Sequence, residues 1–228
     1  MSRRGGTRIR ATRRPVVVLA GEDRNDRRCL RILLEAFCDE MRGRLVEINE
    51  PVRLHKVPAE RLPRRISDLA ALARARATTE DAELACVFVH EDLDSGDGDD
   101  YPSIHRRVQD ALCRELGNAH YVLAVEEMEA WLLLFPDALS DLVGSWKLPA
   151  KYRGKDTGRL TDPKGILMRE VSKGGRRYRE SDAPAVLERV VALAIHREPI
   201  GSNRSWTRLG TDIADCCSRH LKQPTKTR

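Results

Sequence analysis

Short apolar runs alternate with longer segments of helical periodicity through the first 135 residues of the chain. Four runs rich in β-branched residues predict strands, at 15–20, 52–57, 84–89 and 119–125. Apolar residues at helical spacing predict helices over 25–42, 62–78 and 103–116, and another in the segment that bears Glu129 and Trp131. This alternation predicts an α/β fold: a Rossmann-like, mostly parallel four-stranded sheet flanked by helices.

The pattern changes after Phe135-Pro136. Residues 145–182 mix glycine, proline and basic residues around one helical stretch at 163–171, and two further amphipathic helices are predicted at 184–196 and 206–219. We therefore expect an α/β domain and a loop-rich, helical extension that packs on the same domain. The predicted parts of the chain are a basic arm (1–14), the α/β domain (15–144), the extension (145–220) and a basic tail (221–228).

Charge and cysteine usage limit the compartment and the partners. The chain of 228 residues has a formal net charge of +6, and the first fourteen residues hold six arginines and no acid. Such basic ends are typical of nucleic-acid contacts and equally of solvated tails, so both interpretations stay open. No apolar window is long enough for a membrane span or a secretory signal, and the six cysteines form no C-x-x-C pair. We expect a cytoplasmic protein with no membrane contact and with reduced thiols.

Acidic residues follow three of the predicted strands at the point where each strand ends. Glu22 follows the first strand, Asp92 and Asp94 follow the third, and Glu126, Glu127 and Glu129 follow the fourth. Because an open α/β sheet forms its active site beyond the carboxyl ends of its strands, these side chains are expected to meet at one edge. Carboxylate oxygens are the ligands that magnesium prefers. The sequence therefore predicts a magnesium site, although each acid could instead stabilise a helix N-terminus.

Spacing refines the candidate ligands. Asp92 and Asp94 flank Leu93, so the alternation of a strand is expected to point both carboxylates the same way. Glu126 and Glu129 lie one helical turn apart and would share a helix face, with Glu127 as the substitute if the helix begins later.

The chain resembles the Toprim fold, and more closely the small stand-alone Toprim-like families of bacterial phage-defence loci. The resemblance rests on the strand and glycine-glutamate at 16–22, the Asp-x-Asp at 92–94, the glutamate-alanine-tryptophan block at 124–133, the proline-lysine element at 162–164, and later blocks at 176–178 and 205–209. It spans about residues 15–212. The sequence departs from the pattern in its polar turn at 23–26 and in Glu91, which stands where an apolar or small residue is more usual.

The resemblance implies a nuclease related to the overcoming-lysogenization-defect enzymes. In that interpretation Glu22, Asp92 and Asp94 hold a first Mg²⁺ or Mn²⁺ ion and, with Lys164, act in catalysis, whereas Glu126 and Glu129 complete a second metal site. Contacts to a DNA or RNA backbone are then expected from three arginines: Arg176, Arg177 and Arg179.

The expected partners follow from the same resemblance. No Walker motif occurs in the chain, so a nucleotide-driven partner would be a separately encoded ATPase. A homodimer is compatible with the sequence. Two alternatives remain open: a catalytically silent partner that docks such an ATPase, and a magnesium-dependent nucleotidyl or glycosyl transferase that uses the Asp pair.

Overall fold

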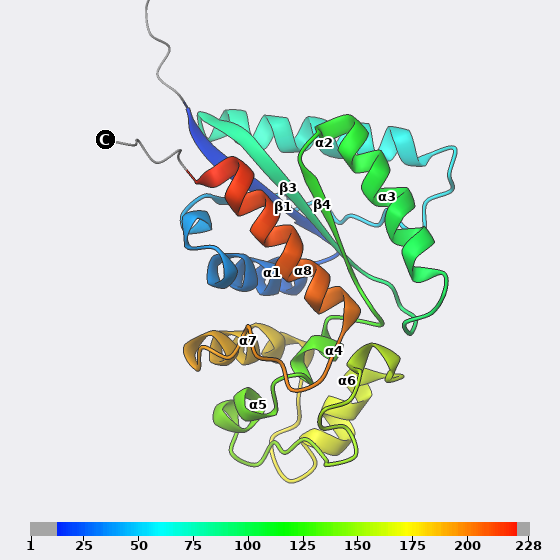
Figure 1. The fold of residues 1–228 in the computed structure, drawn as a ribbon, viewed down its shortest axis with the longest axis vertical. Coiled ribbons are helices and arrows are strands. Elements are labelled where there is room, and N and C mark those ends of the chain that lie inside the picture. Colours follow the sequence, from blue (N-terminus) through cyan, green and yellow to red (C-terminus); the bar gives the residue numbers. More distant parts are fainter. Residues whose placement is uncertain (1–12, 223–228) are drawn as a thin grey trace, which may run out of the picture.

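Four parallel strands form one sheet in the computed structural model of the chain, which describes residues 13–222 (Figure 1). The strand order is β2-β1-β3-β4, and every neighbouring pair is parallel. The strands are β1 (Arg14–Gly21), β2 (Leu45–Glu47), β3 (Ala82–Asp92) and β4 (Ala119–Ala124). The predicted α/β class, with a four-stranded sheet flanked by helices, is confirmed.

Helices cover both faces of this sheet (Figure 1). On one face, α1 (Arg24–Phe37) and α8 (Arg204–Cys216) pack in a single cluster with Val17 and Leu19 of β1. On the other face, α2 (Leu62–Thr79) and α3 (Tyr101–Leu116) pack against Val18 and its neighbours. Successive residues of β1 are thus buried on opposite faces, which explains its unbroken apolar run.

A lobe of short helices lies beyond the carboxyl ends of the strands (Figure 1). Its helices are α4 (Glu129–Leu132), α5 (Pro136–Leu142), α6 (Pro163–Ile166) and α7 (Ala183–Ala192). Short 3-10 or π turns complete the fold: η1 (Asp39–Met41), η2 (Thr157–Arg159), η3 (Leu167–Val171), η4 (Glu180–Asp182) and η5 (Cys217–Leu221). Trp131 and Leu187 of the lobe belong to the same apolar cluster as Leu19 of β1. One core therefore runs from the sheet into the lobe and fixes the lobe over the strand ends.

The prediction of a strand at 52–57 is wrong. The second strand is instead β2, which precedes the predicted segment in the sequence. It pairs with β1. The backbone N–H groups of Leu54 and His55 do not join a ladder, because both donate to the buried carboxylate of Glu91, at 2.7 and 3.1 Å. Alternating burial of Val52 and Leu54 mimics a strand while their segment runs as a loop.

The expectation of six reduced thiols is also wrong. Two disulfides join Cys38 to Cys217 and Cys86 to Cys216, whereas Cys29 and Cys113 are free. Both bonds tie the C-terminal end of α8 and the following turn to distant parts of the chain, at separations of 179 and 130 residues. A pairing at such separations depends on the three-dimensional fold and leaves no local spacing signature.

Side chains of α3 occupy the outer edge of β4. The hydroxyl of Tyr101 donates to the carbonyl of Leu123 at 3.0 Å, and the His105 ring lies 2.7 Å from the carbonyl of Tyr121. Gln109 donates to the carbonyl of Ala119 at 2.7 Å and accepts from the N–H of Tyr121 at 2.7 Å. These three side chains recur every four residues on α3, so they face the strand together and satisfy polar groups that an edge strand normally leaves free.

The predicted basic arm and tail fall mainly on residues 1–12 and 223–228, which lie outside the described residues. Arg14, placed in the arm by the sequence, instead begins β1. Across residues 13–222 none of the helices combines the length and the apolar character that a bilayer crossing requires.

Candidate active site

The strand order places a crevice between the carboxyl ends of β1 and β3. From β1 the chain moves outward to β2 on one side and then to β3 and β4 on the other, so the order reverses between the two central strands. Ligands of open α/β sheets bind at such a reversal. A pocket of about 140 Å³ opens there. Seven carboxyl side chains and two basic ones line it: Glu22, Asp23, Asp26, Asp92, Asp94, Glu129, Glu180, Arg53 and Lys164.

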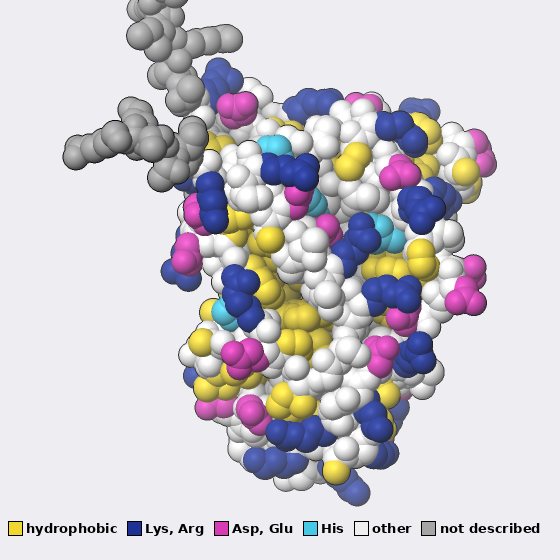
Figure 2. Space-filling model, in the orientation of Figure 1, with side chains coloured by type: hydrophobic (Ala, Val, Ile, Leu, Met, Phe, Trp, Pro, Cys, Tyr) yellow, Lys and Arg dark blue, Asp and Glu magenta, His cyan; other side chains and the backbone are white. Residues whose placement is uncertain are grey.

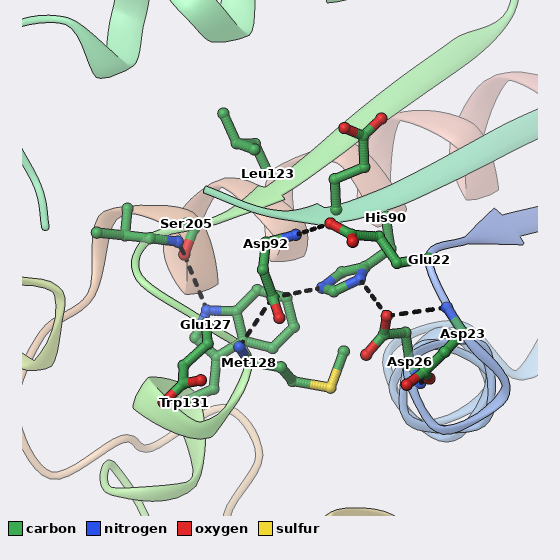
Figure 3. Close-up of polar contacts among 12 residues, drawn as sticks. Glu22, Asp23, Asp26, His90, Asp92, Leu123, Glu127, Met128, Trp131 and Ser205 are labelled. Carbon is green, nitrogen blue, oxygen red and sulfur yellow. Dashed lines mark hydrogen bonds and ion pairs between the residues drawn. The ribbon is translucent and has the colours of Figure 1, made fainter. Parts of the chain in front are cut away.

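Asp92 lies at the centre of this arrangement (Figure 3). Its carboxylate accepts a hydrogen bond from the N–H of Met128 at 3.0 Å, and its own N–H donates to Glu22 at 3.2 Å. Burial raises the pKa of Asp92 well above its usual value, and the nearby carboxylates of Asp26 and Glu129 raise it further. Glu22 and Asp92, which follow two different strands and are 70 residues apart in the sequence, are thus in direct contact.

Asp94 reaches the same pocket by a different route from the one predicted. The strand ends at Asp92, and Asp94 adopts a left-handed conformation with φ of 57°, so simple alternation does not apply. Its side chain is 58% exposed and forms an ion pair with Lys56. Both Asp carboxylates line the pocket, but Asp94 lies at its solvent side.

His90 is a member of the site to which the sequence analysis gave no role. Its ring is fully buried and lies between Asp26 and Asp92, with one nitrogen 3.8 Å from a carboxylate oxygen of each (Figure 3). Neither ring nitrogen has a hydrogen-bond partner among residues 13–222. Burial lowers the pKa of His90 to about 4, so the ring is neutral at physiological pH. The available signal was its position two residues before Asp92, which places both on the same face of β3.

Asp26 joins the site from the first turn of α1. Asp23 caps this helix and accepts from the N–H of Asp26 at 2.9 Å, while the carboxylate of Asp26 accepts from the N–H of Asp23 at 3.3 Å. Burial and the charge of Asp23 raise the pKa of Asp26 to about 6. The carboxylate of Asp26 also faces the ring of His90.

The three glutamates after β4 separate, contrary to the prediction that Glu126 and Glu129 share a helix face. Because α4 begins only at Glu129, Glu126 stays outside the helix, with φ of 59°. Glu126 does not line the pocket, whereas Glu129 does and is buried. Burial and the charge of Glu127 raise the pKa of Glu129 to about 7. The hydroxyl of Tyr178 donates to Glu129 at 3.1 Å.

Lys164 lies against the glutamates of the lobe and lines the pocket. Its ammonium group lies 3.3 Å from Glu127 and 3.0 Å from Glu180, and its N–H donates to Glu127 at 2.7 Å. Burial alone would lower the pKa of Lys164, but the hydrogen bond to Glu180 and the charges of Glu129 and Glu127 outweigh it and raise that pKa. Glu127 therefore serves as the partner of Lys164.

The arginines predicted to bind nucleic acid do not line the pocket. Arg176 forms an ion pair with Asp182 and lies over the ring of Trp146, and Arg177 donates to the carbonyl of Met168 at 2.9 Å. The side chain of Arg179 is exposed. Tyr178, in the middle of this run, is the residue that points into the protein toward Glu129.

Glu91 belongs to the acidic run but not to the site. It points to the opposite face of β3, where its fully buried carboxylate accepts from the N–H of Leu54 and lies 2.6 Å from the ring of His55. This contact anchors the loop that carries Arg53 and Lys56. Arg53 lies 2.9 Å from Glu22, and Lys56 pairs with Asp94, so two cations on one loop face two candidate ligands.

The donor set of the crevice fits a hard divalent cation. The pocket supplies carboxylate oxygens, and the buried imidazole of His90, which does not line the pocket, lies beside two of them, Asp26 and Asp92. Over residues 13–222, the groups of three His, Cys, Asp or Glu side chains whose ligand atoms all lie within 4.8 Å of one another are Cys86-His120-Cys216 and Cys38-Glu40-Cys217. Among the described residues, no three carboxylates of the crevice therefore bring their ligand atoms within 4.8 Å of one another.

Comparisons with protein-family models, with curated proteins and with solved structures found no match to this chain. The chemistry of the crevice must therefore be argued from its own residues.

Proposed function

We propose that the chain is a divalent-metal-dependent nuclease of Toprim type, which hydrolyses phosphodiester bonds of DNA or RNA in the crevice. The observation that carries the proposal is the contact between Glu22 and Asp92 at the reversal of strand order, beside a buried histidine with two unpartnered nitrogens. Acidic side chains collected where a sheet binds its ligands repel one another and favour a bound cation. Such a cation can activate water and stabilise negative charge during phosphodiester hydrolysis.

Glu22, Asp92 and Asp94 would hold Mg²⁺ or Mn²⁺, as the Toprim resemblance implies. Glu129 and Asp26 line the same pocket and are the nearest further carboxylates to extend the ligand set. We leave Glu126 out of this set because it lies outside the pocket. A bound ion of this kind would lower the pKa of a water ligand and stabilise negative charge on the phosphate.

Two side chains of the lobe have the properties that hydrolysis needs. Glu129 has a pKa near 7, so its carboxylate exchanges a proton readily at neutral pH and can accept one from the attacking water. Lys164 stays protonated and lines the same pocket, where its charge can stabilise the leaving oxygen. Both residues are fixed by neighbours, Glu129 by Tyr178 and Lys164 by Glu180.

The test is a cleavage assay with a matched acidic control. Wild type, Asp92→Asn and Asp99→Asn are incubated with plasmid, single-stranded DNA and tRNA in Mg²⁺, Mn²⁺ or EDTA. Asp99 is an exposed acid of the loop after β3, outside the pocket, so its substitution changes the charge equally. We expect metal-dependent cleavage by wild type and Asp99→Asn, and a loss of about a hundredfold or more in Asp92→Asn. Equal cleavage by all three proteins would show that activity arises elsewhere or from a contaminant.

The resemblance further supports the proposal that this nuclease is the effector of an anti-phage system and acts with a separately encoded ATPase. The absence of a Walker motif from the sequence is consistent with a separate motor subunit. The assay is therefore repeated with any ATPase that is found encoded beside this chain. If wild type cleaves no substrate in either format while it binds Mn²⁺ by calorimetry, the nuclease proposal is contradicted in favour of a silent ATPase partner.

A further inference from the structure

A second hollow lies along the outer edge of β4, between α3 and the first turns of α8. It has a volume of about 310 Å³ and is lined by residues of these two helices only. We call it the α3–α8 groove. In Figure 2, dark blue basic side chains and cyan histidine gather on the face where α3 and α8 are turned toward the viewer. The groove is separate from the crevice, since the two pockets share no lining residue.

The groove is positively charged. Arg106, Arg204 and Arg208 line it, against a single acid, Asp110. Arg106 is exposed and forms no ion pair with any described residue. Arg208 lies 3.7 Å from Asp212, beyond hydrogen-bonding distance, and its side chain is 45% exposed. Arg106 is therefore free to bind an incoming anion, and Arg208 keeps N–H groups that its ion pair with Asp212 does not use.

The floor of the groove excludes one class of occupant. A peptide that adds a strand to a sheet needs free N–H and C=O groups along the edge. Along β4 the carbonyls of Ala119, Tyr121 and Leu123 and the N–H of Tyr121 are already taken by side chains of α3. What the groove still offers is guanidinium groups, whose planar N–H donors match phosphate oxygens.

The groove is connected to the crevice through its own residues. Arg204 lies 3.0 Å from Asp97, at the end of the loop that carries Asp94 to the crevice. The next residue, Ser205, accepts a hydrogen bond from the N–H of Val125, directly after β4. The start of α8 thus links the groove to the loop after β3 and to the end of β4, both of which border the crevice.

We propose that the α3–α8 groove binds the phosphate backbone of the nucleic acid whose phosphodiester is hydrolysed in the crevice. This inference rests on the proposed nuclease function. Arg106 and Arg208 contact phosphate oxygens, while Arg204, already paired with Asp97 and stacked over Tyr101, shapes the groove. Phosphate contacts of this kind position the substrate without reading its sequence.

The test measures binding without cleavage. Fluorescein-labelled 30-nucleotide single-stranded DNA, duplex DNA and RNA are titrated with protein in EDTA at several salt concentrations. The groove variant is Arg106→Gln/Arg208→Gln, and the control is Arg64→Gln/Arg114→Gln, which removes two exposed arginines outside the groove. We expect the groove variant to bind about tenfold more weakly and the slope of log affinity against log salt to decrease by about 2. The control should bind as wild type does.

Binding and cleavage are read separately, so the two proposals fail separately. If Asp92→Asn binds nucleic acid normally through the groove but wild type cleaves nothing, the groove stands and the nuclease function falls. If the groove variant and the control bind equally well, or if wild type binds none of the three nucleic acids at low salt, the groove proposal is overturned.

Discussion

Ser205 offers the sharpest test of how the site is held together. Its buried hydroxyl accepts from the indole N–H of Trp131 at 2.8 Å (Figure 3). It also accepts from the N–H of Val125 at 3.1 Å and donates to Asn203 at 2.6 Å. It thereby joins the start of α8 to the end of β4 and to α4. Ser205→Ala removes little volume but leaves two buried donors without an acceptor.

The expected cost follows from those two donors. An unsatisfied buried donor costs about 1–3 kcal/mol, so two give about 3 kcal/mol after partial relaxation. For a chain of this size that corresponds to a decrease in Tm of about 6–12 °C. The α8 cap itself should survive, because Asn203 still accepts from the N–H groups of Ser205 and Trp206 at 3.0 and 3.2 Å.

Urea denaturation followed by circular dichroism and by tryptophan fluorescence measures this cost. The matched control is Ser103→Ala, which removes an exposed hydroxyl that donates to the carbonyl of Asp100 and should cost less than about 0.5 kcal/mol. If Ser205→Ala lowers the free energy of unfolding by less than about 1 kcal/mol, the hydroxyl does not carry the junction and the reasoning is refuted.

Three further predictions concern the charges and the thiols. Arg53→Ala removes the cation that faces Glu22. Because a partly exposed ion pair is worth about 1 kcal/mol at most, we expect the Mn²⁺ affinity measured by calorimetry to rise about two- to fivefold. A decrease in affinity would contradict the competition between Arg53 and the metal. Burial raises the pKa of Glu129, so its carboxyl favours the fold only while it is protonated. In EDTA the free energy of unfolding should therefore fall by up to about 3 kcal/mol as pH rises from about 5 to 8. Glu129→Gln should flatten this decline in thermal denaturation scans. Thiol titration of the denatured, unreduced protein should count two groups, Cys29 and Cys113, and six after reduction; six at the outset would contradict both disulfides.

The parts of the fold that could be predicted are those that a local sequence pattern specifies. The apolar runs at β1, β3 and β4 are buried on both faces, so composition and length identified them. The run at 52–57 has the same alternation, but its hydrogen bonds go to Glu91, a residue 37 positions away from Leu54. No local pattern distinguishes an N–H that joins a ladder from one that meets a distant carboxylate.

The site was predictable to the extent that it follows strand ends. Glu22 and Asp92 were found because the carboxyl ends of parallel strands share one edge. Glu126 was misplaced because α4 begins three residues later than periodicity suggested. The contact between His90 and Asp26 was not predicted. It depends on how α1 packs against β3, which brings a ring nitrogen within 3.8 Å of the carboxylate.

The anchoring of the Arg53 and Lys56 loop by Glu91 has a consequence for time scale. On one face of β3, Asp92 points into the crevice; on the other face, Glu91 holds the loop that carries the two cations. Arg107 adds a contact to the carbonyl of Val57 at 3.3 Å, so the loop is fixed along its length. Displacement of Arg53 and Lys56 by the proposed metal ion would require their exposed side chains to rotate while the backbone stays in place. Withdrawal of the two cationic side chains would proceed at the rate of rotamer changes, on the picosecond-to-nanosecond scale, rather than at the slower rate of loop motion.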